Sequence, residues 1–273
     1  MKKILLAITL LALLTTACGK SNSNPSETAT EGEIEKIVLG VSATPHGEIV
    51  EHLKPQLEAE GLDVEIVTFN DYVQPNLQLD SGDLDANFFQ HTAYLVKFNE
   101  DRGTKVVEVP ESDVFISPIG LYSKNYQSVE ELPDGAEIII PNDPTNGARG
   151  LLVLHHLGII KVDNPDNLNI TENDIVDNPK NLKFKAMEAP NIPRVYEDAD
   201  AAFINFNYAV QGGLDPKTTI AVEDEKSPYK NVVAVREGDE NQEKYKKLVK
   251  VLRSEECRKF MEDTFEGGAV PTF

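Results

Sequence analysis

Aromatic residues and a histidine gather in two short segments of this sequence, each where a predicted strand ends. Tyr72 lies in FNDYVQPN, and Phe88, Phe89, His91 and Tyr94 lie in NFFQHTAYL. In an open parallel sheet, ligands bind beyond the carboxyl ends of the strands. The two segments therefore predict an apolar pocket with hydrogen-bonding edges. The alternative is that Phe88 and Phe89 point into two different cores while His91 caps a helix.

Arg149 is the residue best placed to hold an anion. It follows the predicted strand EIII and the turn PNDPTNG, in the first turns of a predicted helix. The free N–H groups and the dipole of a helix N-terminus favour an anion, and a guanidinium matches a carboxylate with two bonds. Asn205 ends the strand AAFIN and Asn231 begins the strand NVVAV, so their carboxamides could hold an ammonium or a carboxylate oxygen. For either asparagine alone, capping a turn is the alternative.

No pattern in the chain indicates catalysis. The sequence contains no G-x-S-x-G, H-E-x-x-H, Walker or G-x-G-x-x-G motif. His46, Glu48 and His52 carry metal-binding side chains, but His46 precedes the predicted helix that carries His52. We therefore predict that the protein is not an enzyme and has no metal or cofactor. A metal-binding lipoprotein or secreted metalloenzyme built on His46, His91 and a carboxylate is the alternative from a different class.

Strands and helices are predicted to alternate from Ile34 onward, which indicates βαβ units. The apolar runs predict strands over 37–42, 64–69, 84–89, 105–109, 114–123, 137–140, 182–188, 201–205 and 231–237. The periodic stretches predict helices over 49–57, 71–81, 91–101, 241–260 and from the PNDPTNGARG segment through 156, and a capping box at 128–131 opens a short helix. This order predicts an α/β protein of two lobes, each a mostly parallel sheet flanked by helices.

The charge balance narrows the classes of partner. The chain has 273 residues, with 26 Lys and Arg against 46 Asp and Glu, for a formal net charge of −20 at pH 7. Affinity for a phosphate backbone comes from Lys and Arg, so this balance argues against nucleic acid. The two cysteines form no CxxC pair, which rules out a disulfide-rich scaffold and a thiolate zinc site.

The N-terminus carries the pattern of a secreted, lipid-modified protein. A basic start, MKK, precedes an apolar run over 4–14, which is too short to cross a hydrocarbon core of ~30 Å and is typical of a signal peptide. The following TTACG resembles a bacterial lipobox, in which Cys18 is diacylated. An ordinary signal peptide with an incidental cysteine is the alternative. Residues 19–32 hold no aliphatic side chain larger than alanine, which predicts a flexible tether.

Several long segments resemble the NlpA lipoprotein family, the methionine-binding proteins of ABC importers. They are TFNDYVQPN, DANFFQH, PNDPTN with Arg149, NPKNLK, EAP, INFNYA, EDEKSPYKN and FEGGAV, in order from about 37 to 270. The resemblance implies that the thioether of methionine lies among Tyr72, Phe89, His91 and Tyr94. It also implies that the amino-acid head group is held by Arg149, Asn205 and Asn231. Because these side chains should point into a cleft, we expect the fold to survive loss of the head-group residues.

The resemblance further implies a periplasmic-binding-protein-like fold (type II-like). We expect a signal peptide at 1–17, a lipidated tether at 18–33, lobe 1 at 34–115 plus 232–273, and lobe 2 at 116–231. The implied protein is a monomer, anchored by Cys18 on the extracytoplasmic face of the cell membrane. It captures methionine for a membrane permease and its ATPase. D-Methionine or a methionine-containing dipeptide is the alternative ligand within this class.

Overall fold

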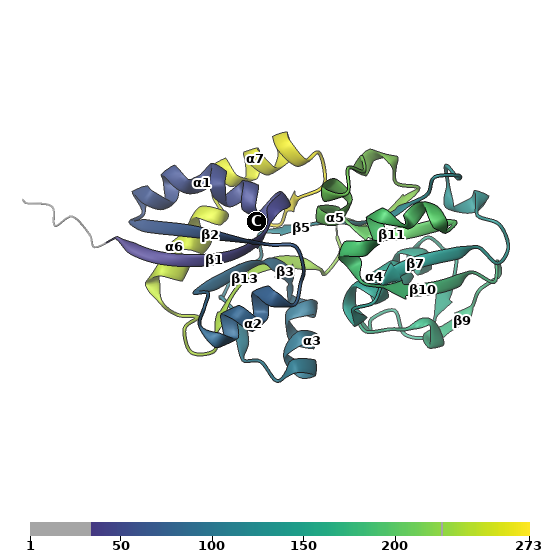
Figure 1. The fold of residues 1–273 in the computed structure, drawn as a ribbon, viewed down its shortest axis with the longest axis horizontal. Helices are drawn as coiled ribbons and strands as arrows, with labels where there is room; N and C mark the ends of the chain where they lie inside the picture. The colour runs from purple at the N-terminus through teal and green to yellow at the C-terminus, as the bar shows by residue number, and fades with distance from the viewer. Residues whose placement is uncertain (1–33, 225) are drawn as a thin grey trace, which may run out of the picture. The chain divides into compact units, whose positions relative to one another are not determined.

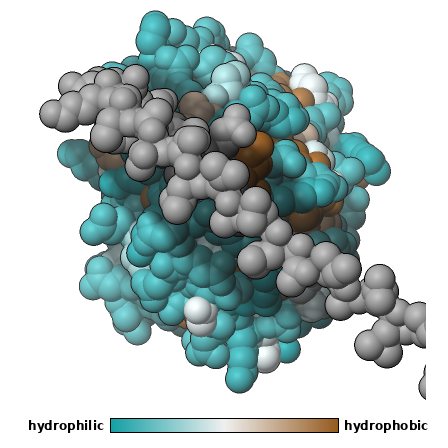
Figure 2. Space-filling view, turned by 90° about the vertical axis from the view of Figure 1, so that its left-hand side faces the viewer, coloured by the Kyte–Doolittle hydropathy of each residue, from teal (hydrophilic) through white to brown (hydrophobic). Residues whose placement is uncertain are grey.

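The computed structural model describes residues 34–273 except residue 225. The predicted signal peptide at 1–17, the lipidated Cys18 and the tether at 18–33 lie outside the described residues. Within the described part of the chain, no helix is both long and apolar enough to cross a membrane. The surface in Figure 2 is hydrophilic over most of the visible face, in keeping with the high content of acidic residues.

Seven strands form the first sheet, in the order β14-β5-β13-β3-β1-β2, with β4 also paired to β13 (Figure 1). Toward one edge of this sheet, β1 (Glu35–Ser42) pairs in parallel with the edge strand β2 (Leu62–Phe69) and with β3 (Ala86–His91). The remaining strands pair antiparallel: β4 (Val106–Glu108), β5 (Phe115–Ile116), β13 (Lys230–Arg236) and β14 (Val270–Pro271).

Helices cover both faces of this sheet. Alternate residues of β1, Ile37, Leu39 and Val41, pack in one core with α1 (Glu48–Ala59), α6 (Glu243–Leu252) and α7 (Glu255–Phe265). Val38, between them, packs in the opposite core with α2 (Gln74–Ser81) and α3 (Thr92–Arg102). This alternation follows from the two-residue period of a strand.

Five strands form the second sheet, in the order β10-β7-β11-β6-β12. They are β6 (Ile119–Tyr122), β7 (Glu137–Pro141), β10 (Lys183–Met187), β11 (Ala201–Asn205) and β12 (Ala221–Val222). The helices α4 (Pro144–His156) and α5 (Phe206–Gln211) follow β7 and β11, and a two-stranded ribbon joins β8 (Lys161–Val162) to β9 (Ile175–Asp177). Both large sheets are mixed, with parallel pairs beside antiparallel ones, where the sequence predicted mostly parallel sheets.

The chain passes between the sheets twice, and these crossings explain the mixed pairing. The strand expected over 114–123 is broken at Ser117 and Pro118, so that β5 joins the first sheet and β6 the second. Proline has no N–H to donate to a ladder, which suits such a break. After β12 the chain returns, and β13 lies between β5 and β3, antiparallel to both.

Two further local predictions were wrong. The helix expected over 241–260 is divided into α6 and α7, because Ser254 caps a new helix by accepting a hydrogen bond from the Cys257 amide at 3.2 Å. The capping box expected at Ser128 is absent, since its side chain makes no cap hydrogen bond and only a short 3₁₀ turn follows at Val129–Glu131. Neither difference reaches the candidate site.

Candidate ligand-binding site

A cavity lies between the two sheets, and all seven residues predicted to bind a ligand line it. They come from the loop after β2, the end of β3, α3, α4, the end of β11 and the start of β13: Tyr72, Phe89, His91, Tyr94, Arg149, Asn205 and Asn231. Five further residues line the same cavity: His46, Gln90, Ser117, Asn146 and Asn207. The structure therefore brings together the seven residues predicted to bind a ligand.

Three aromatic rings form one wall of the cavity. The ring centroid of Tyr72 lies 5.9 Å from that of Phe89 and 5.8 Å from that of Tyr94. The hydroxyl of Tyr94 donates to the backbone carbonyl of Tyr72 at 2.9 Å. The neighbouring Phe88 is fully buried in the core that β1 shares with α1, α6 and α7. Its ring lies 4.8 Å from that of His46. One phenylalanine thus faces the cavity and the other a core.

His91 both caps a helix and lines the cavity. The two roles that the sequence offered as alternatives, helix cap and pocket residue, therefore occur together. Its Nδ1 accepts a hydrogen bond from the Tyr94 amide at 3.0 Å, which leaves the ring proton on Nε2. Nε2 lies 3.4 Å from Oδ1 of Asn146, toward which its proton is directed. Burial, and then the positive charge of Arg149, holds the pKa of His91 well below its usual range. His91 is therefore a neutral hydrogen-bond donor at neutral pH.

Arg149 is the sixth residue of α4 and lies close to the end of β7. The helix can approach this strand because Gly147 has no side chain, and a Cβ there would stand 2.8 Å from the carbonyl oxygen of Pro141. The N-terminus of α4 is not open to a ligand anion, contrary to the sequence prediction, because Asp143 caps it. The Asp143 carboxylate accepts from the Asn146 amide at 2.9 Å.

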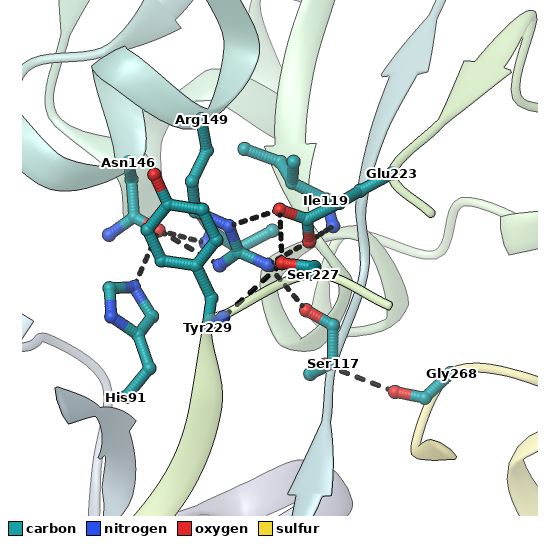
Figure 3. A network of polar contacts seen from close by, with 10 residues as sticks. His91, Ser117, Ile119, Asn146, Arg149, Glu223, Ser227, Tyr229 and Gly268 are labelled. Atoms are coloured by element: carbon teal, nitrogen blue, oxygen red, sulfur yellow. Dashed lines mark hydrogen bonds and ion pairs between the residues drawn. The ribbon is translucent and has the colours of Figure 1, made fainter. Parts of the chain in front are cut away.

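The guanidinium of Arg149 is also not free. Its side chain is 2 % exposed and forms a two-bonded ion pair with Glu223, which is 7 % exposed (Figure 3). The guanidinium stacks on the ring of Tyr229, with Cζ 4.6 Å from the ring centroid. Burial lowers the pKa of Arg149, but the Glu223 carboxylate outweighs this and holds the pKa above its usual value. Sequence reasoning missed Glu223 because the segment EDE offers no sign of which acid is buried.

Two asparagines that line the cavity have one unpaired acceptor and one unpaired donor among the described residues. Asn205 donates from Nδ2 to Oδ1 of Asn146 at 2.9 Å, and its own Oδ1 is buried with no hydrogen-bond partner among the described residues. Asn207 accepts at Oδ1 from the Tyr72 hydroxyl at 2.6 Å, and its buried Nδ2 likewise has no partner in the described part of the chain. Buried polar groups are rarely left unpaired. These two atoms therefore point to a polar ligand.

Asn231 is oriented from behind by a second histidine. Its Oδ1 accepts from Nε2 of His46 at 2.9 Å, which leaves Nδ2 as the group of this cavity-lining residue that can donate to a ligand. Nδ1 of His46 in turn bonds with the Ser42 hydroxyl at 2.7 Å. Neither Asn205 nor Asn231 caps a turn: Asn205 stands at the start of α5 without a cap hydrogen bond, and Asn231 lies within β13.

The buried histidines should make the free energy of unfolding depend on pH. Burial lowers the pKa of His46 to about 4, with the Asn231 hydrogen bond opposing the shift, and His91 is also lowered. The unfolded chain therefore takes up protons first as the pH falls below ~6.5. We expect the free energy of unfolding to be intact above pH 6.5 and to decrease toward pH 4 by up to about 1.4 kcal/mol per pH unit for each histidine.

Denaturant unfolding at several pH values tests this expectation. His46→Gln should flatten the decrease, whereas His156→Gln, at an exposed position, should leave it unchanged. Equal slopes in wild type and His46→Gln would show that His46 is not the group responsible.

The described residues contain no group of three His, Cys, Asp or Glu side chains placed to hold a metal ion. The ring Nε2 atoms of His46 and His91 both face asparagine oxygens. The geometry thus offers hydrogen bonds to an organic solute and gives no support to the metal alternative.

The protein has two lobes, each built on one sheet with its helices, and the chain passes between them twice. A polar and aromatic cavity lies between the lobes, which is the architecture of a two-lobed solute-binding protein. The sequence model of the NlpA lipoprotein family matches residues 37–273, and the chain belongs to that family. The D-methionine-binding lipoprotein MetQ of Salmonella typhi is 43 % identical over 263 residues, covering 95 % of this chain and 93 % of that protein. The predicted family is confirmed.

Solved structures share the fold. A nutrient-binding protein from Burkholderia cenocepacia, bound to methionine, has a TM-score of 0.82 and 45 % identity, covering 87 % of this chain and all of that one. A periplasmic substrate-binding protein of an ABC transporter from Coxiella burnetii has a TM-score of 0.81 and 40 % identity, covering 86 % of this chain and all of that one. The predicted two-lobed, periplasmic-binding-protein-like α/β fold is confirmed.

Proposed function

We propose that this protein captures methionine in the cavity between its two sheets and delivers it to an ABC importer. The observation that carries the proposal is the pair of unpartnered carboxamide atoms, Asn205 Oδ1 and Asn207 Nδ2, in a buried cavity with an aromatic wall. One is an acceptor that suits an ammonium, and the other is a donor that suits a carboxylate. The methionine-bound relative and the MetQ relative support the same ligand.

In this proposal the two ends of methionine meet different walls. The thioether lies among Tyr72, Phe89, His91 and Tyr94, where sulfur–aromatic contacts contribute about 0.3–1.5 kcal/mol each. The head group contacts Arg149, Asn205 and Asn231. The uncharged carboxamides can hold both the ammonium and the carboxylate, which a site made of one sign of charge could not do.

The choice of ligand tests the aromatic wall. Norleucine keeps the shape of methionine and loses the polarisable sulfur, so calorimetry should show binding that is about 3- to 30-fold weaker. Glutamate should not bind, because none of the described residues on the wall that would face its second carboxylate is an unpaired cation. Glutamate binding at parity with methionine would contradict the assignment of Tyr72, Phe89 and Tyr94 to the side-chain pocket.

Mass spectrometry of the small molecule released by denaturing freshly purified protein identifies the natural ligand. Methionine is expected; chiral analysis distinguishes its L and D forms, and the mass separates a methionine-containing dipeptide. Stoichiometric zinc retained through purification without chelators would instead favour a metal-binding lipoprotein or metalloenzyme.

We further propose that the mature chain is anchored through lipidated Cys18 to the extracytoplasmic face of the membrane and acts as a monomer with a permease and its ATPase. The lipobox-like TTACG and the lipoprotein relatives support the anchor. Cys18→Ala should release the protein from the membrane fraction into the periplasm or medium, because one apolar anchor is removed. Fractionation and immunoblotting measure this. Retention of the variant in the membrane fraction would contradict the lipid anchor.

A further inference from the structure

Arg149 uses most of its hydrogen-bonding capacity on the protein itself. A guanidinium has five N–H donors. Nε and Nη2 donate to the two carboxylate oxygens of Glu223, Nη2 donates also to the Ser117 carbonyl at 2.9 Å, and Nη1 donates to Oδ1 of Asn146 at 3.2 Å (Figure 3). One hydrogen on Nη1 is left for a ligand. Arg149 can therefore give a bound carboxylate a single bond, and not the two-bonded match that an unpaired arginine offers.

Glu223 is held as firmly as its partner. Besides Arg149, its carboxylate accepts from the Ser227 hydroxyl at 3.0 Å and from the Ile119 amide at 3.4 Å. Its side chain is 7 % exposed, so the acid and the guanidinium form a buried pair of opposite charges. The pair has no net charge beside the cavity.

A second carboxylate stands behind Asn146. Asp143 accepts from the amide and from Nδ2 of Asn146, both at 2.9 Å, and its burial raises its pKa. Among the residues that the structure describes, the cavity therefore has no uncompensated positive charge with which to hold an anion. Its free polar groups are the carboxamides of the asparagines and one N–H of Arg149.

We propose that Glu223 determines the net charge of the ligand that the cavity accepts. By neutralising Arg149, it makes the cavity suited to a zwitterion and excludes compounds that carry a carboxylate without an ammonium. A lone charge brought into a buried site without a partner costs several kilocalories per mole, whereas the two charges of a zwitterion balance each other. This inference rests on the proposed function and adds a specificity-determining residue that does not itself line the cavity.

A purely structural role for Glu223 predicts a different binding result from a charge-setting role. If the acid only holds Arg149 in place, its loss should weaken all ligands in proportion. If it sets the charge, its loss should change the ratio between ligands, because Arg149 then has an unpaired positive charge. The ratio is therefore the quantity to measure.

Calorimetry with methionine and with 4-(methylthio)butanoate, which lacks only the amino group, makes this comparison. In the wild type the deaminated acid should bind at least about 100-fold more weakly than methionine. In Glu223→Gln, which preserves shape and removes the charge, the ratio should narrow by about tenfold or more. Glu197→Gln removes one negative charge at an exposed position and should leave the ratio unchanged.

Each result bears on one proposal. An unchanged ratio in Glu223→Gln overturns the charge-setting role. If that variant does not fold, the wild type alone decides: binding of 4-(methylthio)butanoate within about threefold of methionine overturns the inference, and the expected 100-fold gap supports it. Failure of the wild type to bind methionine would instead overturn the proposed function.

Discussion

Arg149→Ala should weaken methionine binding by roughly thirty- to several-thousand-fold, the equivalent of about 2–5 kcal/mol for losing a charged partner at a buried site. The substitution removes the bond from Nη1 to the ligand, and it also removes a donor from Asn146, whose Oδ1 accepts from both Arg149 and Asn205. Titration calorimetry measures the affinity. Near-wild-type affinity for methionine would contradict the assignment of Arg149 to the head group of the ligand.

The same substitution should also destabilise the fold, which revises the expectation from the sequence. Arg149→Ala leaves the Glu223 carboxylate buried without its cation, at a cost of about 3–5 kcal/mol. The double variant Arg149→Ala/Glu223→Ala removes the unpaired charge and should recover part of this stability without recovering binding. Melting curves of the single and double variants separate the two effects. No difference between them would show that the ion pair does not contribute to the fold.

Asn205→Ala and Asn231→Ala should both weaken methionine binding, by about 30-fold or more, because a closed cavity admits no water in place of the lost carboxamide. Their effects on the unliganded protein should differ. Asn231→Ala leaves Nε2–H of His46 buried without an acceptor, which costs about 1–3 kcal/mol. Asn205→Ala removes an oxygen that has no partner among the described residues, together with one donor to Oδ1 of Asn146, which still accepts from Arg149 and His91, so it should cost little.

Methionine titrations and thermal melts of the two variants test this contrast. If both variants bind normally and both melt earlier, the asparagines serve the fold and not the ligand. If Asn231→Ala alone keeps its stability, the hydrogen bond to His46 is not a support for the site.

The residues that line the cavity could be predicted because they stand in long segments of unusual composition. TFNDYVQPN, DANFFQH and INFNYA each combine aromatic and amide side chains at the end of a strand, and the carboxyl ends of strands meet at one edge of a sheet. Asn207 lies in one of these segments and was still missed, because its role depends on a hydroxyl from the other sheet.

The partners of the predicted residues could not be found in this way. Glu223 is one of three acids in EDE, and only the fold brings it to Arg149, 74 residues earlier in the chain. The sequence predicts the boundary between the lobes at 115/116, but it still predicts one strand over 114–123. Only the pairing of the two halves of VFISPIGLYS with different sheets divides that strand. The local sequence pattern predicts which residues lie at one site. Long-range packing determines the orientation of each side chain, its hydrogen-bond partners and its ion pairs.

The hydrogen bond from the Tyr72 hydroxyl to Asn207 has a consequence for the timing of transport. It joins the loop after β2, in the first sheet, to α5, which follows the second, and both residues line the cavity. This bond ties the two sheets together beside the cavity. We therefore expect the residence time of a bound solute to depend on how often the sheets part, in addition to the strength of its own contacts. A permease that holds the two sheets apart would speed release without competing for the solute itself.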